Sequence, residues 1–162
     1  MRIIFHDCNY DIYTDFCVHY YLNYKNNSYT KKEIFEYIKK NQRNISKLSI
    51  APGNLIYMGK DKLNNKIYIL NRRKYKNIVC QALKGLIDIF NPDKINSDKK
   101  VTFFNLGYYR NIYLSGIHII KLLNSPEIFT NKIYLMGILK IKNQFKNDLI
   151  ELHENVKKES NK

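Results

Sequence analysis

The sequence has few of the residues that build the commoner ligand sites. It contains three cysteines, Cys8, Cys17 and Cys80, and none of them lies in a C-x-x-C spacing, which argues against a disulfide framework and against a cysteine zinc site. The six glycines are scattered and form no phosphate-binding or nucleophile-elbow motif, and the four histidines form no H-E-x-x-H motif. We therefore expect no metal site and no cofactor.

Long hydrophobic runs are also missing. The N-terminal run is too short for the apolar core of a secretory signal. No later stretch reaches the roughly 20 apolar residues that span a bilayer. The expected location is the cytoplasm, with no membrane partner.

Asn, Lys, Ile and Tyr make up half of the chain, while alanine occurs only at Ala51 and Ala82. Such a bias is typical of an AT-rich coding sequence. The net charge of +14 comes from 28 cations, of which only five are arginine, so much of it reflects the lysine supply of such a genome. The 44% hydrophobic content excludes a disordered chain.

Apolar periodicity predicts alternating strands and helices over one domain at residues 1–156, with a frayed basic tail at 157–162. This order predicts an α/β fold: a three-layer domain whose mixed, mostly parallel sheet of about five strands is flanked by helices. The expected strands are residues 3–5, 55–58, 67–70, 101–106 and 133–136, and the second and third of them form an expected hairpin. The expected helices are residues 11–23, 30–42, 78–90, 109–123 and a last one through 145–156, with Thr30 and Glu33 as a capping box at the start of the second. Apolar stripes predict which side chains of two helices face the core: Ile78, Val79, Ala82, Leu86, Ile89 and Phe90 in one, and Ile112, Tyr113, Gly116, Ile117, Ile120 and Leu123 in the other.

His6, Asp7 and Cys8 follow the first expected strand and precede the first helix. Ligands in open α/β sheets bind at the carboxyl ends of parallel strands, so these residues are the first candidates for a site. An imidazole beside a carboxylate suits acid–base work, and a thiol near a helix start can be reactive. The alternative is structural: a packed histidine, a helix-capping aspartate and an inert cysteine. A phosphatase-type Cys-x5-Arg motif is disfavoured because position 14 is Thr14.

Three of the five arginines, Arg72, Arg73 and Arg110, fall in expected strand-to-helix connections. Free N–H groups at a helix start attract anions, and arginine offers a planar fork for carboxylate or phosphate. The alternative is a solvated basic turn with a helix-flanking arginine.

Some of these landmarks resemble a family of unknown function from Firmicutes, especially clostridia and other spore formers. They are the Phe5-His6-Asp7 start, residues 54–61 and residues 66–73 with the helix after them. Family members read Tyr-His-Asp or Tyr-His-Cys and then a Gly-Gly-x-His loop. Residues 8–14 here lack both glycines and the second histidine, so the motif is degenerate. The resemblance implies the fold and the source, and it implies no reaction.

The leading hypothesis is a binding or regulatory module that holds a small anionic ligand near His6, Asp7, Cys8 and the three arginines. One alternative is nucleic-acid binding, motivated by the isoelectric point near 9.6 and the 14 tyrosines but unsupported by a motif. The other is a hydrolase or transferase that uses His6, Asp7 and Cys8. The chain shows no signature of a known enzyme, and it carries no signal for an oligomeric state.

Overall fold

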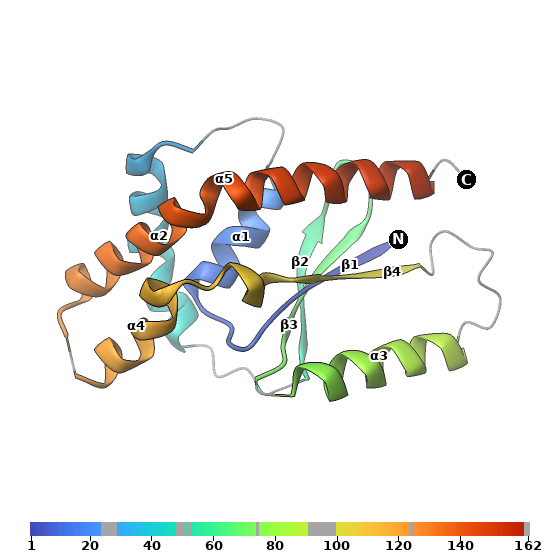
Figure 1. The fold of residues 1–162 in the computed structure, drawn as a ribbon, viewed down its shortest axis with the longest axis horizontal. Coiled ribbons are helices and arrows are strands. Elements are labelled where there is room, and N and C mark those ends of the chain that lie inside the picture. Colours follow the sequence, from blue (N-terminus) through green and yellow to red (C-terminus); the bar gives the residue numbers. More distant parts are fainter. Residues whose placement is uncertain are drawn as a thin grey trace. The chain divides into compact units, whose positions relative to one another are not determined.

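A computed structural model describes residues 1–23, 29–47, 51, 53–73, 75–90, 100–123 and 125–160 (Figure 1). The elements, in chain order, are β1 (Arg2–Asp7), α1 (Ile12–Leu22), α2 (Lys31–Lys47), β2 (Leu55–Lys60), β3 (Lys66–Asn71), α3 (Lys76–Phe90), β4 (Val101–Asn105), the short 3-10 helix η2 (Leu106–Tyr109), α4 (Ile112–Leu122) and α5 (Glu127–Ser160).

The described strands form one sheet in the order β2-β3-β1-β4. Strands β3, β1 and β4 are parallel, and β2 joins the edge antiparallel to β3. The α/β fold with a mixed, mostly parallel sheet is therefore confirmed, and so is the hairpin formed by β2 and β3. The sheet has four strands instead of about five.

The fifth expected strand, residues 133–136, is wrong because these residues lie inside α5. A run of four apolar residues looks the same in a buried strand and in a buried helix. The buried positions Tyr134, Ile138, Ile141 and Phe145 recur at intervals of three or four residues, which is the helical period. Helix α5 also continues to Ser160, so residues 157–160 of the expected frayed tail are helical.

The chain divides into two compact units, each built from segments that are distant in sequence. The sheet unit comprises Met1–Tyr10, Ile50–Gly107 and Leu152–Lys162, and the helical unit comprises Asp11–Ser49 and Tyr108–Glu151. The expectation of a single domain over residues 1–156 stays a prediction.

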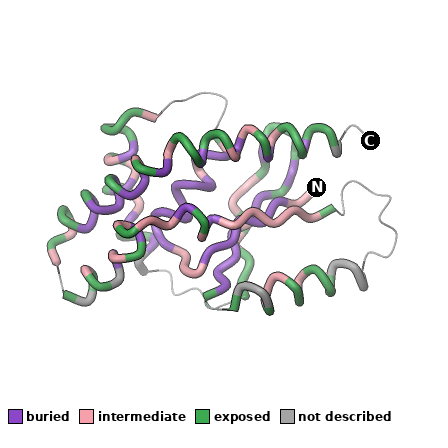
Figure 2. Tube along the Cα trace, viewed as in Figure 1, coloured by how far each residue is buried: buried purple, intermediate pink, exposed green. Residues whose placement is uncertain are grey.

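In the sheet unit, the central strand β1 is buried along most of its length (Figure 2). Helix α3 and the last turns of α5 lie on opposite sides of the strands (Figure 1), and Lys84 of α3 lies 5.6 Å from the ring centre of Phe103 in β4. The edge strand β2 leaves Leu55 and Tyr57 exposed, so its apolar side chains are not covered on both faces.

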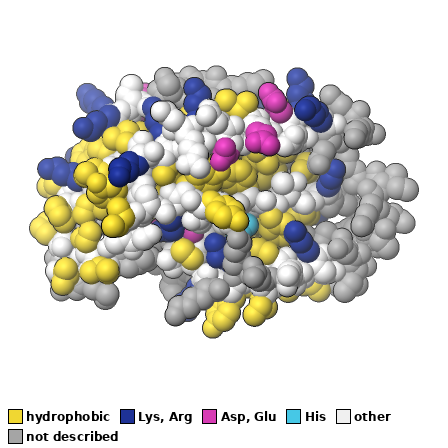
Figure 3. All heavy atoms as spheres, in the orientation of Figure 1, with side chains coloured by type: hydrophobic (Ala, Val, Ile, Leu, Met, Phe, Trp, Pro, Cys, Tyr) yellow, Lys and Arg dark blue, Asp and Glu magenta, His cyan; other side chains and the backbone are white. Residues whose placement is uncertain are grey.

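The predicted inward stripes of α3 and α4 are wrong in part, because Ile78, Leu86, Ile112 and Leu123 are exposed. Figure 3 shows hydrophobic side chains at the surface of the helical unit. Other positions of the predicted stripes do turn inward, among them Val79 of α3, which is half-buried, and Ile117 of α4, which is buried. Positions outside the predicted stripes join them: Cys80 and Leu83 are half-buried in α3, and Leu114 is buried in α4.

In the helical unit, α1 is buried on nearly all sides and packs against α2. Thr30 and Glu33 form a capping box at the start of α2: the Thr30 N–H donates to Glu33 Oε2 over 2.6 Å, and the Glu33 N–H donates to Thr30 Oγ1 over 3.3 Å. Of the helices described, none combines the length and the apolar character that crossing a membrane requires.

Candidate functional site

The carboxyl ends of β1, β3 and β4 meet at one edge of the sheet unit. The chain adds β3 and β2 on one side of β1 and then β4 on the other, so the strand order reverses at β1. Such a reversal is where open α/β sheets usually bind their ligands. Register places His6 opposite Leu70 of β3 and Asn105 of β4, and Asp7 opposite Asn71.

His6 and Asp7 are the last two residues of β1 rather than the first two after it, because the ladder to β3 continues through them. They are 4% and 0% exposed. Cys8 lies next in the loop, half-buried, with its Sγ 3.8 Å from Asn9 Nδ2. Helix α1 is capped by Asp11, whose carboxylate accepts from the Thr14 N–H, so the capping role considered for Asp7 belongs to Asp11.

The centre of the site is the guanidinium of Arg72, a residue only 8% exposed. Its Nε–H donates to His6 Nδ1 over 3.0 Å, and Nη2 donates to Asn105 Oδ1 over 3.2 Å. Nη1 donates to the Arg73 carbonyl over 3.5 Å. These three acceptors are uncharged, and one N–H on each terminal nitrogen is left for a further acceptor.

The contact with Arg72 also determines the form of His6. A nitrogen that accepts a hydrogen bond from a guanidinium carries no proton, so the imidazole proton is assigned to Nε2. His6 therefore cannot use Nδ1 as a general base while Arg72 holds it.

Asp7 supplies the carboxylate of this edge. Its Oδ1 accepts from the Cys8 N–H over 2.6 Å, and its backbone carbonyl accepts from the Arg72 N–H over 3.0 Å. A methyl group added to Gly107 would lie 2.7 Å from Arg72 Nη2, 3.1 Å from Asn105 Oδ1 and 3.5 Å from Asp7 Oδ1. The guanidinium, the amide and the carboxylate thus surround one point, and only glycine leaves that point open.

Replacing Gly107 by alanine should therefore displace the Arg72 guanidinium. Arg72 would give up its hydrogen bonds to Asn105 and His6, and we expect the free energy of unfolding to fall by about 1–3 kcal/mol, the range for overpacking a filled site. Urea unfolding measures this change.

The control for that measurement is Gly85→Ala in α3, where an added methyl group meets no atom within 4 Å. It should be neutral or slightly stabilising, because alanine favours a helix over glycine. Equal stability of the two variants would show that Arg72 is not held where the geometry places it.

Arg73 differs from Arg72 because its side chain is exposed. Its backbone is in the left-handed region, with φ of 45°, and its N–H faces Asn71 Oδ1 at 3.4 Å. Asn71 therefore supports a tight turn after β3, which presents Arg73 to solvent.

Arg110 belongs to the helical unit, whereas Arg72 and Arg73 belong to the sheet unit. Its Nη2 donates to Asp11 Oδ2 over 2.8 Å, and its Nη1 donates to the Leu114 carbonyl over 3.3 Å. Both side chains of this ion pair are buried. Arg110 is thus engaged in a contact within its own unit.

Two residues of the edge, Asn105 and Gly107, were not anticipated from the sequence. Both lie at the end of the predicted strand at 101–106, in the same way that Asp7 and Cys8 lie at the end of the first strand. A polar residue and a glycine after a predicted strand could have indicated a site. Neither carries a charge, however, and asparagine is too common in this chain to single out Asn105.

The fold and this edge define an α/β protein with a buried arginine–histidine pair at the carboxyl ends of its parallel strands. The chain belongs to the family described as "Protein of unknown function (DUF3189)", whose profile matches residues 3–158. No curated protein and no solved structure matches the chain. The family supports the predicted resemblance to proteins of unknown function, and it names no activity.

Proposed function

We propose that this protein is a cytoplasmic binding or regulatory module that holds a small phosphate-like anion at the carboxyl edge of β1, β3 and β4. The observation that carries the proposal is the buried Arg72 guanidinium, whose hydrogen-bond acceptors are all uncharged. The Asp7 carboxylate lies close to it, but Arg72 forms no ion pair among the described residues. Arginine binds two oxygens of an oxyanion at once, so an oxyanion would supply a counter-charge in direct contact with the guanidinium.

The neighbours of Arg72 fit this role. The exposed side chain of Arg73 adds a second cation beside the edge. The Asp7 carboxylate lies near the same point as the Arg72 guanidinium and would repel an anion, so the proposed ligand would have to bind Arg72 away from that carboxylate. We further propose that the source is a Firmicute and that residues 8–14 are a degenerate form of the family's glycine-rich loop.

The test is the thermal unfolding of the full chain in phosphate, pyrophosphate and nucleotides, each against sodium chloride at equal ionic strength. A ligand at about 100 times its Kd stabilises the folded state by roughly 2.7 kcal/mol. Arg72→Lys keeps the charge but loses the fork, and it should weaken binding at least tenfold. Arg73→Gln should weaken it a few-fold.

The matched control is Lys66→Gln, because Lys66 lies exposed at the other end of β3. This variant should bind like the unchanged chain. An equal loss in Lys66→Gln and Arg72→Lys would mean general attraction to a basic protein. Absence of stabilisation by any anion would remove the proposal.

A further inference from the structure

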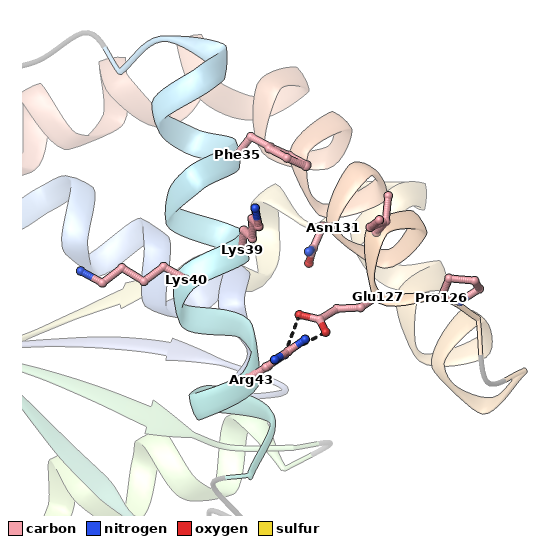
Figure 4. A pocket seen from close by; sticks show the side chains of 8 residues that line it. Phe35, Lys39, Lys40, Arg43, Pro126, Glu127 and Asn131 are labelled. Carbon is pink, nitrogen blue, oxygen red and sulfur yellow. Dashed lines mark hydrogen bonds and ion pairs between the residues drawn. The ribbon is translucent and has the colours of Figure 1, made fainter.

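The helical unit contains a cavity of about 730 Å³ between α2 and the start of α5 (Figure 4). Phe35 of α2, Ile128 of α5 and Pro126 just before α5 supply apolar surface. Polar groups come from Lys39, Arg43 and Asn131. This volume lies within the range of small-molecule sites, about 300–1,000 Å³, which are mostly apolar with a few polar groups. The cavity lies wholly in the helical unit, so binding there does not depend on the proposed function of the sheet unit.

Asn131 is the polar group that points to a ligand. It is only 3% exposed, and its Oδ1 is buried without a hydrogen-bond partner. Figure 4 shows its amide directed from α5 into the space in front of α2. Buried amides are almost always hydrogen-bonded in folded proteins. Because the terminal torsion of asparagine is broad, a donor on a ligand in the cavity can reach this amide.

The charges at the mouth favour an anion. Arg43 Nε lies 3.0 Å from Glu127 Oε2 at one end of the cavity. The charges of these two side chains therefore cancel. Lys40 extends to the other side of α2, away from α5 (Figure 4). Lys39 also lines the cavity, and among the described residues it pairs with no carboxylate.

We propose that this cavity binds a small amphipathic carboxylate that carries an N–H or O–H donor, such as an N-acylated apolar amino acid. The apolar body contacts Phe35 and Ile128, the carboxylate faces Lys39, and the donor bonds to Asn131. These three contacts use the apolar surface, the lysine and the buried amide oxygen of the cavity.

The experiment is calorimetric titration of the full chain with N-acetylphenylalanine and two comparators. N-acetylphenylalaninamide keeps the ring and the N–H group but has no carboxylate, and 3-phenylpropionate keeps the ring and the carboxylate but has no N–H group. We expect saturable binding of N-acetylphenylalanine, at least threefold weaker binding of the amide and about tenfold weaker binding of 3-phenylpropionate. The side-chain amide signals of Asn131 in a ¹⁵N–¹H spectrum should shift with N-acetylphenylalanine.

Single substitutions test the hydrogen bond to Asn131 and the contact with Lys39 separately. Asn131→Leu keeps the volume and should make N-acetylphenylalanine bind no better than 3-phenylpropionate. Lys39→Gln should remove the preference for the acid over the amide. The matched control Lys146→Gln removes an exposed lysine of α5 that is not part of the cavity and should keep that preference.

The outcomes that overturn the proposal are specific. Equal binding of acid and amide, or equal effects of Lys39→Gln and Lys146→Gln, would exclude recognition of the carboxylate. Unchanged discrimination in Asn131→Leu would exclude the hydrogen bond. Failure of all three compounds to bind saturably would exclude the site.

Discussion

Replacement of Arg110 by methionine should lower the free energy of unfolding by about 3–5 kcal/mol, the usual loss when one partner of a buried ion pair is removed. The side chains of Arg110 and Asp11 are only 7% and 6% exposed and lie 2.8 Å apart. Arg110 also lies over the ring of Tyr13, 5.1 Å from its centre. Methionine retains most of the apolar bulk, so the loss comes from leaving the Asp11 carboxylate buried without its cation.

Urea unfolding measures this loss, and Arg43→Met is its matched control. Arg43 also pairs with a carboxylate, but its side chain is 77% exposed, and exposed pairs contribute about 0–1 kcal/mol. The double variant Arg110→Met with Asp11→Asn should recover part of the loss, because asparagine removes the uncompensated charge and still caps α1. Equal effects of Arg110→Met and Arg43→Met would contradict the buried pair.

Gly137→Ala should lower the free energy of unfolding by about 1–3 kcal/mol through overpacking. An added methyl group would lie 2.6 Å from Leu114 Cγ and 2.7 Å from Leu114 Cδ2. Leu114 is fully buried, and Asn111 fixes the start of α4 by donating from Nδ2 to the Gly137 carbonyl over 2.8 Å. Neither helix can therefore move aside without breaking that contact.

Gly116→Ala in α4 is the control for this prediction, since a methyl group there meets no atom within 4 Å. It should stabilise the protein by roughly 0.5–1 kcal/mol through helix propensity alone. Denaturant unfolding of the two variants compares the same chemical change at a crowded and an open helix position. If the Gly137→Ala variant were at least as stable as the unchanged chain, the close packing of α4 on α5 would be refuted.

Much of the fold could be predicted because its signals are local. The apolar runs of β1 and β3 and the capping residues Thr30 and Glu33 act within a few positions of one another. The prediction of a strand at residues 133–136 was wrong because four consecutive apolar residues show neither the helical nor the strand period. Its correct assignment required the repeat that extends through the rest of α5.

The candidate edge could be predicted only in part. The positions of His6 and Arg72 could be inferred from the rule that loops at the carboxyl ends of parallel strands converge. The partners that decide their chemistry could not, because Asn105 is uncharged and the role of Gly107 depends on space between side chains. The pairing of Arg110 with Asp11 could not be predicted either, because the two residues are 99 positions apart and nothing local indicates it.

The discontinuous make-up of the sheet unit has a consequence for biosynthesis. Strand β1 emerges from the ribosome before its neighbours β3 and β4, which begin at Lys66 and Val101, and the unit is completed by residues from Leu152 onward. Until those segments are translated, this apolar strand lacks the two strands that it pairs with in the folded sheet. Nascent chains with such exposed strands are prone to aggregate, so ribosome-associated chaperones should engage this protein before β4 is translated.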